Sequence, residues 1–430
     1  MGRPGRWLPR DRNALSEWLD DTIRKAEARK PARLHPVVED FRLMIESDPV
    51  MFMYFTQMFQ EQSSFQPPKG SGDIKLKNYQ QMLVVIDHIL TTAPTFDSTK
   101  MVGCPINAIL DFPMSTLAGL AAFASPKVNE ILRRVLIAWG TFLNSADSLY
   151  VLNDSPTGWL SPEARKAVHL DEFETDSAAP FLGFKSWNDF FIRRFKTGRR
   201  PVACPDDPHA ITSPCEATPY ALRSHVKEHD AFWIKSQPYS LRHLLHGHLI
   251  QPFVGGTVYQ AFLSAENYHR WHSPVSGTIK MLEVVPGTYF SEAASEGFDP
   301  VGPNNSQGYI AHVAARALLF IEADNHDIGL MCLVLVGMGE VSSCVFSDHD
   351  GQPLKEGQRL RKGDQVGYFQ FGGSTHCLVF RPGVISQFAI GAVPQGENGL
   401  DSALVKVNSL LATVARSQTV EDQNRSGKVH

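Results

Sequence analysis

The sequence predicts an α+β protein in which a helical N-terminal domain precedes a β-rich C-terminal domain. Two observations support this. Apolar residues at helical spacing dominate residues 1–150, whereas short apolar runs bounded by glycine and proline dominate residues 181–430. The later runs are not separated by helices of crossover length, which favours α+β over a doubly wound parallel sheet. Residues 151–180 are expected to connect the two domains.

Helices are predicted in the N-terminal domain from apolar residues that share one face. In residues 36–45, for example, Val37, Phe41 and Ile45 fall on one side of a helix. The same pattern recurs in residues 51–59, 79–90 and 128–143. Residues 62–73 are rich in proline, glycine and serine and predict a loop.

The connector and the C-terminal domain follow in order. Within the connector, Ser161-Pro162-Glu163 predicts the start of a short helix, because proline is tolerated at the first helical position. Residues 187–195 predict a short aromatic-rich helix or turn. Strands are predicted at residues 256–263, 277–285, 317–322, 329–337, 341–346 and 367–371.

Composition and charge exclude several classes of protein. The 430 residues carry a formal net charge of −4, which argues against a nucleic-acid partner and against a basic membrane-binding field. No apolar run is long enough to span a bilayer, and no apolar segment follows the N-terminal arginines as in a signal peptide. The six cysteines form no Cys-x-x-Cys pair. We therefore expect a cytoplasmic protein without an integral membrane span.

The most informative segment is Gly372-Gly373-Ser374-Thr375, which follows the last predicted strand. A glycine pair allows positive φ and lets another group approach the backbone closely. The hydroxyl of Ser374 is therefore well placed to reach the carbonyl of Gly373. Alone, the segment is more typical of a tight turn between strands.

Two further segments supply an acid and histidines. Residues 268–277 contain His269 and His272, and residues 211–217 contain Glu216. Taken separately, these residues are also typical of hydrogen-bonded or solvated side chains, and no third ligand stands at a spacing expected for zinc. Taken with Ser374, they are the parts of a proton-relay triad in which a carboxylate orients an imidazole that activates a hydroxyl. No Gly-x-Ser-x-Gly motif is present, which disfavours an α/β-hydrolase.

These segments resemble the phosphatidylserine decarboxylase family. The resemblance extends from residues 187–195 through the region after Ser374, and is strongest to a soluble fungal branch that decarboxylates amino acids such as L-tryptophan in the psilocybin pathway. Further segments similar to that branch are residues 45–50, 158–160, 239–245, 285–290 and 320–325.

The resemblance implies that the chain makes its own cofactor, a covalent pyruvoyl group derived from Ser374. The Ser374 hydroxyl would attack the Gly373 carbonyl, and the chain would be cut between these residues. By position, His272 matches the base for this self-cleavage. Glu216 stands where the phospholipid-type enzymes carry aspartate; this departure keeps the charge but weakens the case for phosphatidylserine as substrate.

The resemblance also implies how the mature enzyme works. The pyruvoyl carbonyl would form a Schiff base with the amine of an aromatic L-amino acid, with L-tryptophan and its product tryptamine as the first candidates, and His269 would supply or relay a proton. Neither pyridoxal phosphate nor a metal is expected. The two cleavage products would stay associated, and a homodimer is compatible with the family. Two alternatives stay open: decarboxylation of phosphatidylserine, and an uncleaved relative that only binds ligands.

Overall fold

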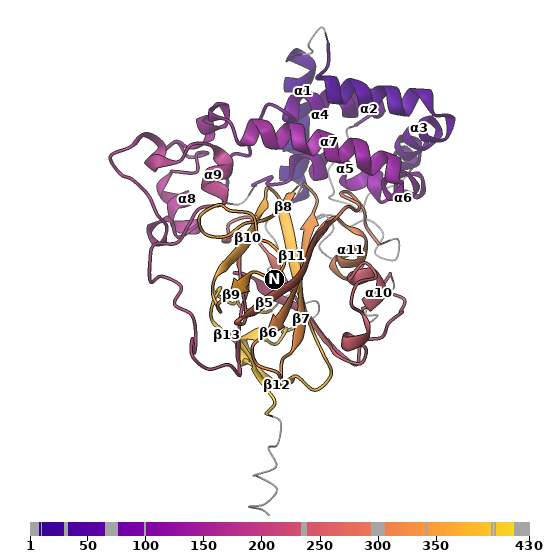
Figure 1. The fold of residues 1–430 in the computed structure, drawn as a ribbon. Coiled ribbons are helices and arrows are strands. Elements are labelled where there is room, and N and C mark those ends of the chain that lie inside the picture. Colours follow the sequence, from indigo (N-terminus) through magenta and orange to yellow (C-terminus); the bar gives the residue numbers. More distant parts are fainter. Residues whose placement is uncertain are drawn as a thin grey trace, which may run out of the picture.

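The computed structural model places a cap of helices over one end of a β-rich body (Figure 1). It describes residues 8–9, 11–29, 33–64, 76–98, 100–233, 239–293, 306–340, 343–396, 399 and 401–416. The α-helices are α1 (Arg12–Arg29), α2 (Pro36–Ser47), α3 (Pro49–Ser64), α4 (Tyr79–Ile89), α5 (Pro105–Met114), α6 (Leu117–Ala124), α7 (Pro126–Leu143), α8 (Pro162–Ala167), α9 (Trp187–Phe191), α10 (Leu241–Leu244) and α11 (Gln307–Val313). The strands are β1 (Ala210–Thr212), β2 (Thr218–Ser224), β3 (Thr257–Leu263), β4 (Arg270–His272), β5 (Gly277–Val285), β6 (Arg316–Ala323), β7 (Leu330–Met338), β8 (Ser343–Phe346), β9 (Arg359–Leu360), β10 (Gln365–Gln370), β11 (Gly373–Phe380), β12 (Ile385–Phe388) and β13 (Leu410–Val414).

The helices predicted in the N-terminal domain are confirmed as α2, α3, α4 and α7. Helix α4 begins after Asn78, whose side-chain oxygen accepts a hydrogen bond from the amide of Gln81 at 2.9 Å. Helices α1, α5 and α6 were not predicted. The predicted loop at residues 62–73 begins inside α3, and its remainder lies outside the described residues from position 65. None of the described helices combines the length and apolarity that a membrane span requires.

The connector packs tightly against the helices rather than running free. Helix α8 begins at Pro162 as predicted, and Ser161 caps it by accepting a hydrogen bond from the amide of Ala164 at 3.2 Å. Trp159 and Phe173 of the connector are buried in the helical core. That core continues through α9 and also takes in Phe371, which comes immediately before the glycine pair.

The C-terminal body is antiparallel, which confirms the α+β prediction. Its largest sheet has seven strands in the order β2-β3-β11-β7-β6-β5-β9, and two three-stranded sheets have the orders β4-β10-β8 and β1-β13-β12. Each predicted strand is confirmed to within a few residues, with the start of the one at 341–346 lying outside the described residues. Helices α10 and α11 lie beside one face of the large sheet (Figure 1).

One expectation from the glycine-rich segment needs correction. Gly372-Gly373-Ser374-Thr375 is not simply a turn, because Gly373 already begins strand β11. Only Gly372 has a positive φ, of 130°, and it supplies the change of direction between β10 and β11. Strand β11 then runs in the interior of the large sheet, paired with β3 on one side and β7 on the other.

Phe371 links the two regions, so its truncation tests their packing. Its ring centroid lies 4.7 Å from that of Trp139 and 4.4 Å from that of Trp187, and the side chain is buried. We expect Phe371→Ala to lower the free energy of unfolding by about 3–5 kcal/mol, measured by urea denaturation, because it leaves a cavity between the domains. The matched control is Phe52→Ala, which removes an exposed ring. Equal stabilities of the two variants would contradict this packing.

Candidate active site

The junction between Gly373 and Ser374 is buried at the beginning of β11. Ser374 is 1% exposed and lies opposite Leu263 of β3 and Gly337 of β7. Its neighbour on β7 has no side chain, so the serine is not crowded from that direction. Among the described residues, the Ser374 hydroxyl oxygen has no hydrogen-bond partner. A buried hydroxyl in this state costs free energy, and such a group is a candidate for chemistry.

Three apolar cores meet at this junction. Phe371 belongs to the helical core, Leu263 opposite Ser374 belongs to the core between the sheets, and Met338 opposite Gly373 belongs to the core beneath α10 and α11. Successive residues of a strand face opposite sides of the sheet. Ser374 therefore faces the core between the sheets, and Gly373 faces the core beneath α10 and α11. The backbone of the junction is therefore held from several sides.

A polar network fixes the next residue on the opposite face of β11. The Thr375 hydroxyl donates to the carbonyl of Ala261 at 3.0 Å and accepts from the Gln260 amide at 3.1 Å. Gln260 also donates to the carbonyl of Gln307 on α11 at 3.2 Å and bonds to the hydroxyl of Tyr239. This network is fully buried, so it pins the register in which Ser374 stands.

His272 lies on β4 and is held by two partners. Its Nδ1 is 2.8 Å from the carbonyl oxygen of Gly363, which can only accept, so Nδ1 carries the proton. Nε2 is then the acceptor, and the hydroxyl of Tyr268 donates to it at 2.9 Å. Burial lowers the pKa of His272 to about 4, which keeps the imidazole neutral and able to accept a proton.

Glu216 is held by an arginine. Its two carboxylate oxygens accept from Nε and a terminal nitrogen of Arg200 at 2.9 and 2.8 Å, and Arg200 also pairs with Glu172 at 2.8 Å. Among the described residues, neither Glu216 and His272 nor Ser374 and His272 form a hydrogen bond with each other. The structure thus brings Glu216 close to Arg200, and the triad predicted from the sequence stays a prediction.

His269 lies nearer to the junction than His272 along β10. The carbonyl of His269 accepts from the amide of Phe369, whereas His272 is paired with Gln365 at the other end of that strand. The imidazole stacks on Phe191 at a centroid distance of 4.0 Å. Burial, together with the nearby positive charge of Arg193, lowers the pKa of His269 to about 3.

The sequence-based reasoning missed a second buried acid beside the junction. Glu340 follows the all-apolar strand β7 and is 1% exposed. Its Oε1 accepts a hydrogen bond at 2.7 Å from the amide of Asn107 in the first turn of α5, and its Oε2 has no hydrogen-bond partner among the described residues. Burial raises the pKa of Glu340 to about 7. A carboxylate that directly follows an uninterrupted apolar strand was the available signal.

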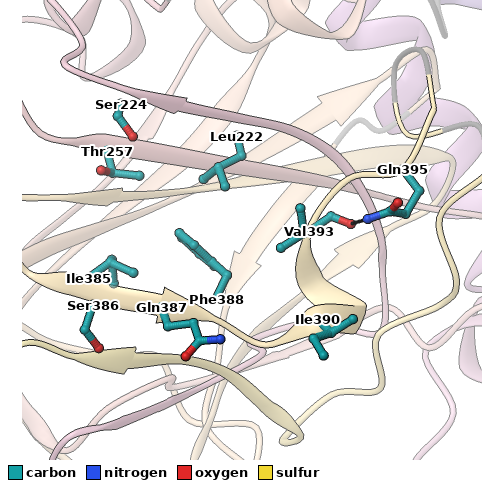
Figure 2. Close-up of a pocket in the computed structure, with 10 residues that line it drawn as sticks. All are labelled: Leu222, Ser224, Thr257, Ile385, Ser386, Gln387, Phe388, Ile390, Val393 and Gln395. Carbon is teal, nitrogen blue, oxygen red and sulfur yellow. Dashed lines mark hydrogen bonds between the residues drawn. The ribbon is translucent and has the colours of Figure 1, made fainter.

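The well-formed cavity in Figure 2 does not belong to this site. Its volume is about 540 Å³, and it lies between β2, β3 and β12. Thr257, which lines it, pairs with Phe380 at the far end of β11 from Ser374. The cavity is therefore separated from the junction by the length of the strand.

With this geometry in place, comparison with known proteins assigns the chain to a family. Sequence profiles described as phosphatidylserine decarboxylase match residues 35–168 and 187–399. The chain belongs to the phosphatidylserine decarboxylase family, and it is a carboxy-lyase. The matches leave residues 169–186 between them, within or beside the connector.

Three relatives illustrate the range of the family. The decarboxylase iboD of Amanita muscaria is 38% identical over 77% of this chain and 100% of the relative. The L-tryptophan decarboxylase of Psilocybe cubensis is 35% identical over 87% of this chain and 88% of the relative. The phosphatidylserine decarboxylase proenzyme 3 of Schizosaccharomyces pombe is 33% identical, over 48% of this chain and 20% of the relative. Similarity to decarboxylase iboD and to the L-tryptophan decarboxylase thus spans both domains.

The buried histidines predict that the uncleaved protein loses stability in acid. Burial lowers the pKa of His376, which follows the junction on β11, to about 3, against 6.5 in an unfolded chain. Because the folded pKa is depressed, the stabilisation is present above pH 6.5 and is lost as the pH falls toward 3. Between pH 7 and pH 5 such a histidine lowers the free energy of unfolding by about 2 kcal/mol.

Urea denaturation at both pH values checks this in a Ser374→Ala background, which keeps the chain whole. Adding His376→Leu should reduce the acid-induced loss by about 2 kcal/mol, which is the share of one histidine. Glu340 shifts stability in the opposite direction, but it is common to both proteins and cancels in the comparison. An identical pH dependence with and without His376 would contradict the assignment.

Proposed function

We propose that this chain is a pyruvoyl-dependent decarboxylase of an aromatic L-amino acid, with L-tryptophan as substrate and tryptamine as product. The observation that carries the proposal is the buried Gly373–Ser374 junction, where an unpartnered hydroxyl follows directly on a glycine carbonyl. The fit to a pyruvoyl group is good, because the group would be made from Ser374 itself and would begin strand β11 inside the protein.

Self-cleavage starts at Ser374. Its hydroxyl oxygen attacks the carbonyl carbon of Gly373 while the hydroxyl proton passes to a base, and the peptide C–N bond breaks to give an ester and a free amino group. Loss of the Cα proton of residue 374 then expels the Gly373 carboxylate and leaves a dehydroalanine. Water adds to its imine tautomer, ammonia leaves, and a pyruvoyl group stands at position 374.

His272 is the proposed base for the first step. Its imidazole is neutral, and Nε2 is its acceptor atom, as base catalysis requires. In the precursor this atom is occupied by the hydroxyl of Tyr268, so the step requires that Nε2 be released toward Ser374. Glu216 is proposed to act on His272 through the intervening Tyr268, whose ionisation is disfavoured both by burial and by the charge of Glu216.

In the mature enzyme the pyruvoyl group supplies a carbonyl that condenses with the substrate amine and accepts the electron pair as CO₂ leaves. The protein must orient the bond to be broken, exclude water and return a proton. His269 is proposed to supply or relay that proton, because it lies nearer to the junction and is shielded from solvent. Two chains, residues 1–373 and 374–430, are proposed to stay associated through the ladders of β11.

The substrate class is supported by the relatives. Relatives named decarboxylase iboD and L-tryptophan decarboxylase match 77% to 95% of this chain, at 33% to 38% identity. Relatives named for phosphatidylserine match 48% to 70% of this chain, at 27% to 33% identity. Glutamate rather than aspartate at position 216 points in the same direction. A cytoplasmic location is proposed separately, because five of the cysteines are buried free thiols, as is usual in a reducing compartment.

Product assays test the proposed substrate. Purified wild-type protein incubated with L-tryptophan should release CO₂ and tryptamine in equal amounts, whereas Ser374→Ala should release neither. Parallel incubations with other aromatic amino acids and with phosphatidylserine vesicles distinguish the alternatives. Phosphatidylethanolamine from the vesicles, without tryptamine from tryptophan, would overturn the proposed substrate class.

Single replacements of His272 and His269 should have different effects on self-cleavage and on turnover. We expect His272→Ala to stay uncleaved, because it removes the base for serine activation. His269→Ala should cleave but lose about 10²-fold or more in turnover, because it lacks the imidazole proposed to relay the proton. Electrophoresis under denaturing conditions and amine assays on the same samples measure both effects. If His269→Ala stays whole while His272→Ala cleaves, the two roles are reversed.

A further inference from the structure

A clamp from the N-terminal domain reaches the cleavage junction. Helix α5 begins with Cys104 as its N-cap, and the Cys104 side chain makes no capping hydrogen bond to the helix. Glu340 caps the helix instead, because its carboxylate accepts from the amide of Asn107 at 2.7 Å. A carboxylate at a helix N-terminus is favoured by the unpaired amides and by the helix dipole. The β-rich body thereby closes the end of a helix from the other domain.

Cys104 joins this contact to the scissile bond. Cys104 lies close enough to the Gly373 backbone and to the Glu340 carboxylate for both to influence the pKa of its thiol, which burial raises. Gly373 is paired with Met338, only two positions before Glu340. Cys104, Asn107 and Glu340 are all less than 5% exposed. The junction, the end of β7 and the start of α5 thus form one buried cluster.

We propose that Cys104 and Glu340 are positioning residues for self-cleavage, so that the N-terminal domain takes part in making the cofactor. This deepens the proposed function and rests on it. Glycine has more backbone freedom than other residues, and that freedom works against a fixed angle of attack on the Gly373 carbonyl. The polar sulfur of buried Cys104, which lies beside the Gly373 backbone, restricts it. Glu340 holds Cys104 in turn by capping the helix that follows it.

Rate measurements on folded precursor test the clamp. We expect Cys104→Ala to slow self-cleavage about tenfold, as loss of roughly 1.4 kcal/mol of positioning implies. Cys104→Ser, which keeps an acceptor, should recover most of the rate, and Glu340→Ala should be slower than Glu340→Gln. The matched control is Cys332→Ala, which removes another buried thiol, on β7, away from the junction.

The readout is the fraction cleaved over time, for proteins whose thermal midpoints show that they are folded. Folded Cys104→Ala that cleaves at the wild-type rate would overturn the clamp while leaving the proposed function intact. A Cys104→Ser variant that does not restore the rate would also overturn the clamp, because the effect of Cys104→Ala would then come from lost packing. A wild-type chain that never cleaves would overturn both. If Glu340→Ala does not fold, the comparison of Cys104→Ala with Cys104→Ser still tests the clamp.

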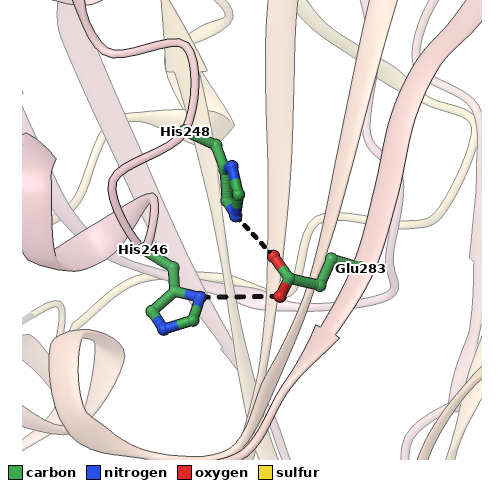
Figure 3. A group of neighbouring side chains, drawn as sticks. All are labelled: His246, His248 and Glu283. Atoms are coloured by element: carbon green, nitrogen blue, oxygen red, sulfur yellow. Dashed lines mark ion pairs between the residues drawn. The ribbon is translucent and has the colours of Figure 1, made fainter.

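A second cluster, away from the junction, has the composition of a metal site. His246 and His248 lie in the loop after α10, and Glu283 lies on β5 (Figure 3). Nδ1 of His246 is 3.6 Å from one carboxylate oxygen of Glu283, and Nε2 of His248 is 2.8 Å from the other. All three ligand atoms lie within 4.8 Å of one another.

Two features set this cluster apart from an ordinary surface ion pair. The Oε2 atom of Glu283 is buried and makes no hydrogen bond of acceptable geometry to any described residue, although Nε2 of His248 lies only 2.8 Å away. Close approach without hydrogen-bond alignment is what two ligands of one ion show. The loop also holds His246 and Leu249 at φ of 51° and 43°, on either side of Gly247 and His248. Such strain is typical of functional loops.

We infer that His246, His248 and Glu283 bind a zinc ion. Two imidazole nitrogens and a carboxylate oxygen are the ligand set of three-coordinate protein sites that leave a fourth position for water. The side chains are 49%, 36% and 31% exposed, so the open position faces solvent. The guanidinium of Arg316 lies close enough to Glu283 to interact with its charge and limits the affinity.

Calorimetric titration of the untagged full-length protein with zinc chloride tests this site. One equivalent should bind to the wild type, and His248→Ala and Glu283→Gln should each weaken binding at least about tenfold, the effect of losing about 1.4 kcal/mol. His225→Ala is the control, because it removes an exposed histidine outside the cluster. The absence of a one-equivalent binding event in the wild type, or equal affinity in all variants, would overturn the inference.

Discussion

The placement of Gly373 at the start of an interior strand is the constraint on which the rest depends. Strand β11 is paired on both sides. Phe371, just before the strand, belongs to the helical core. Leu263 and Met338, which pair with its first two residues, belong to the core between the sheets and to the core beneath α10 and α11. Moving this backbone would break ladder hydrogen bonds and open cavities in several cores at once. A scissile bond held in this way has little freedom, which is what an intramolecular attack needs.

Burial that fixes the junction also sets the protonation of its surroundings. Desolvation keeps His272 and His269 neutral by lowering their pKa values to about 4 and about 3, and it raises the pKa of Glu340 to about 7. The negative charge of Glu216, in contrast, is balanced by Arg200, which donates a hydrogen bond to each carboxylate oxygen. The precursor thus has two uncharged imidazoles, and among the described residues the Ser374 hydroxyl has no hydrogen-bond partner. Glu216 is paired with Arg200, and Glu340 accepts a hydrogen bond from the first turn of α5.

Much of the fold could be predicted from the sequence, because strongly periodic segments specify their own structure. Strand β5 was predicted to the residue, and α2, α4 and α7 to within a few residues. Short elements such as β4 were not predicted, because three residues are too few to show a periodic pattern.

Ser374, His272, His269 and Glu216 were singled out through motifs, but their partners were not. Arg200 stands in the basic run at residues 193–200, where nothing in the sequence marks it as the partner of Glu216. Cys104 and Glu340 come together only because the start of α5 packs against the end of β7. Contacts between residues so distant in sequence depend on tertiary packing.

The central claim is that Ser374 does not survive as serine in the working enzyme. Intact-mass measurement of the purified protein under denaturing conditions tests it directly. The account predicts two species, one ending at Gly373 and one whose mass corresponds to residues 374–430 with a pyruvoyl group in place of the serine. The Ser374→Ala variant should give one uncleaved chain. Active wild-type protein that consists only of an uncleaved 430-residue chain would contradict the account.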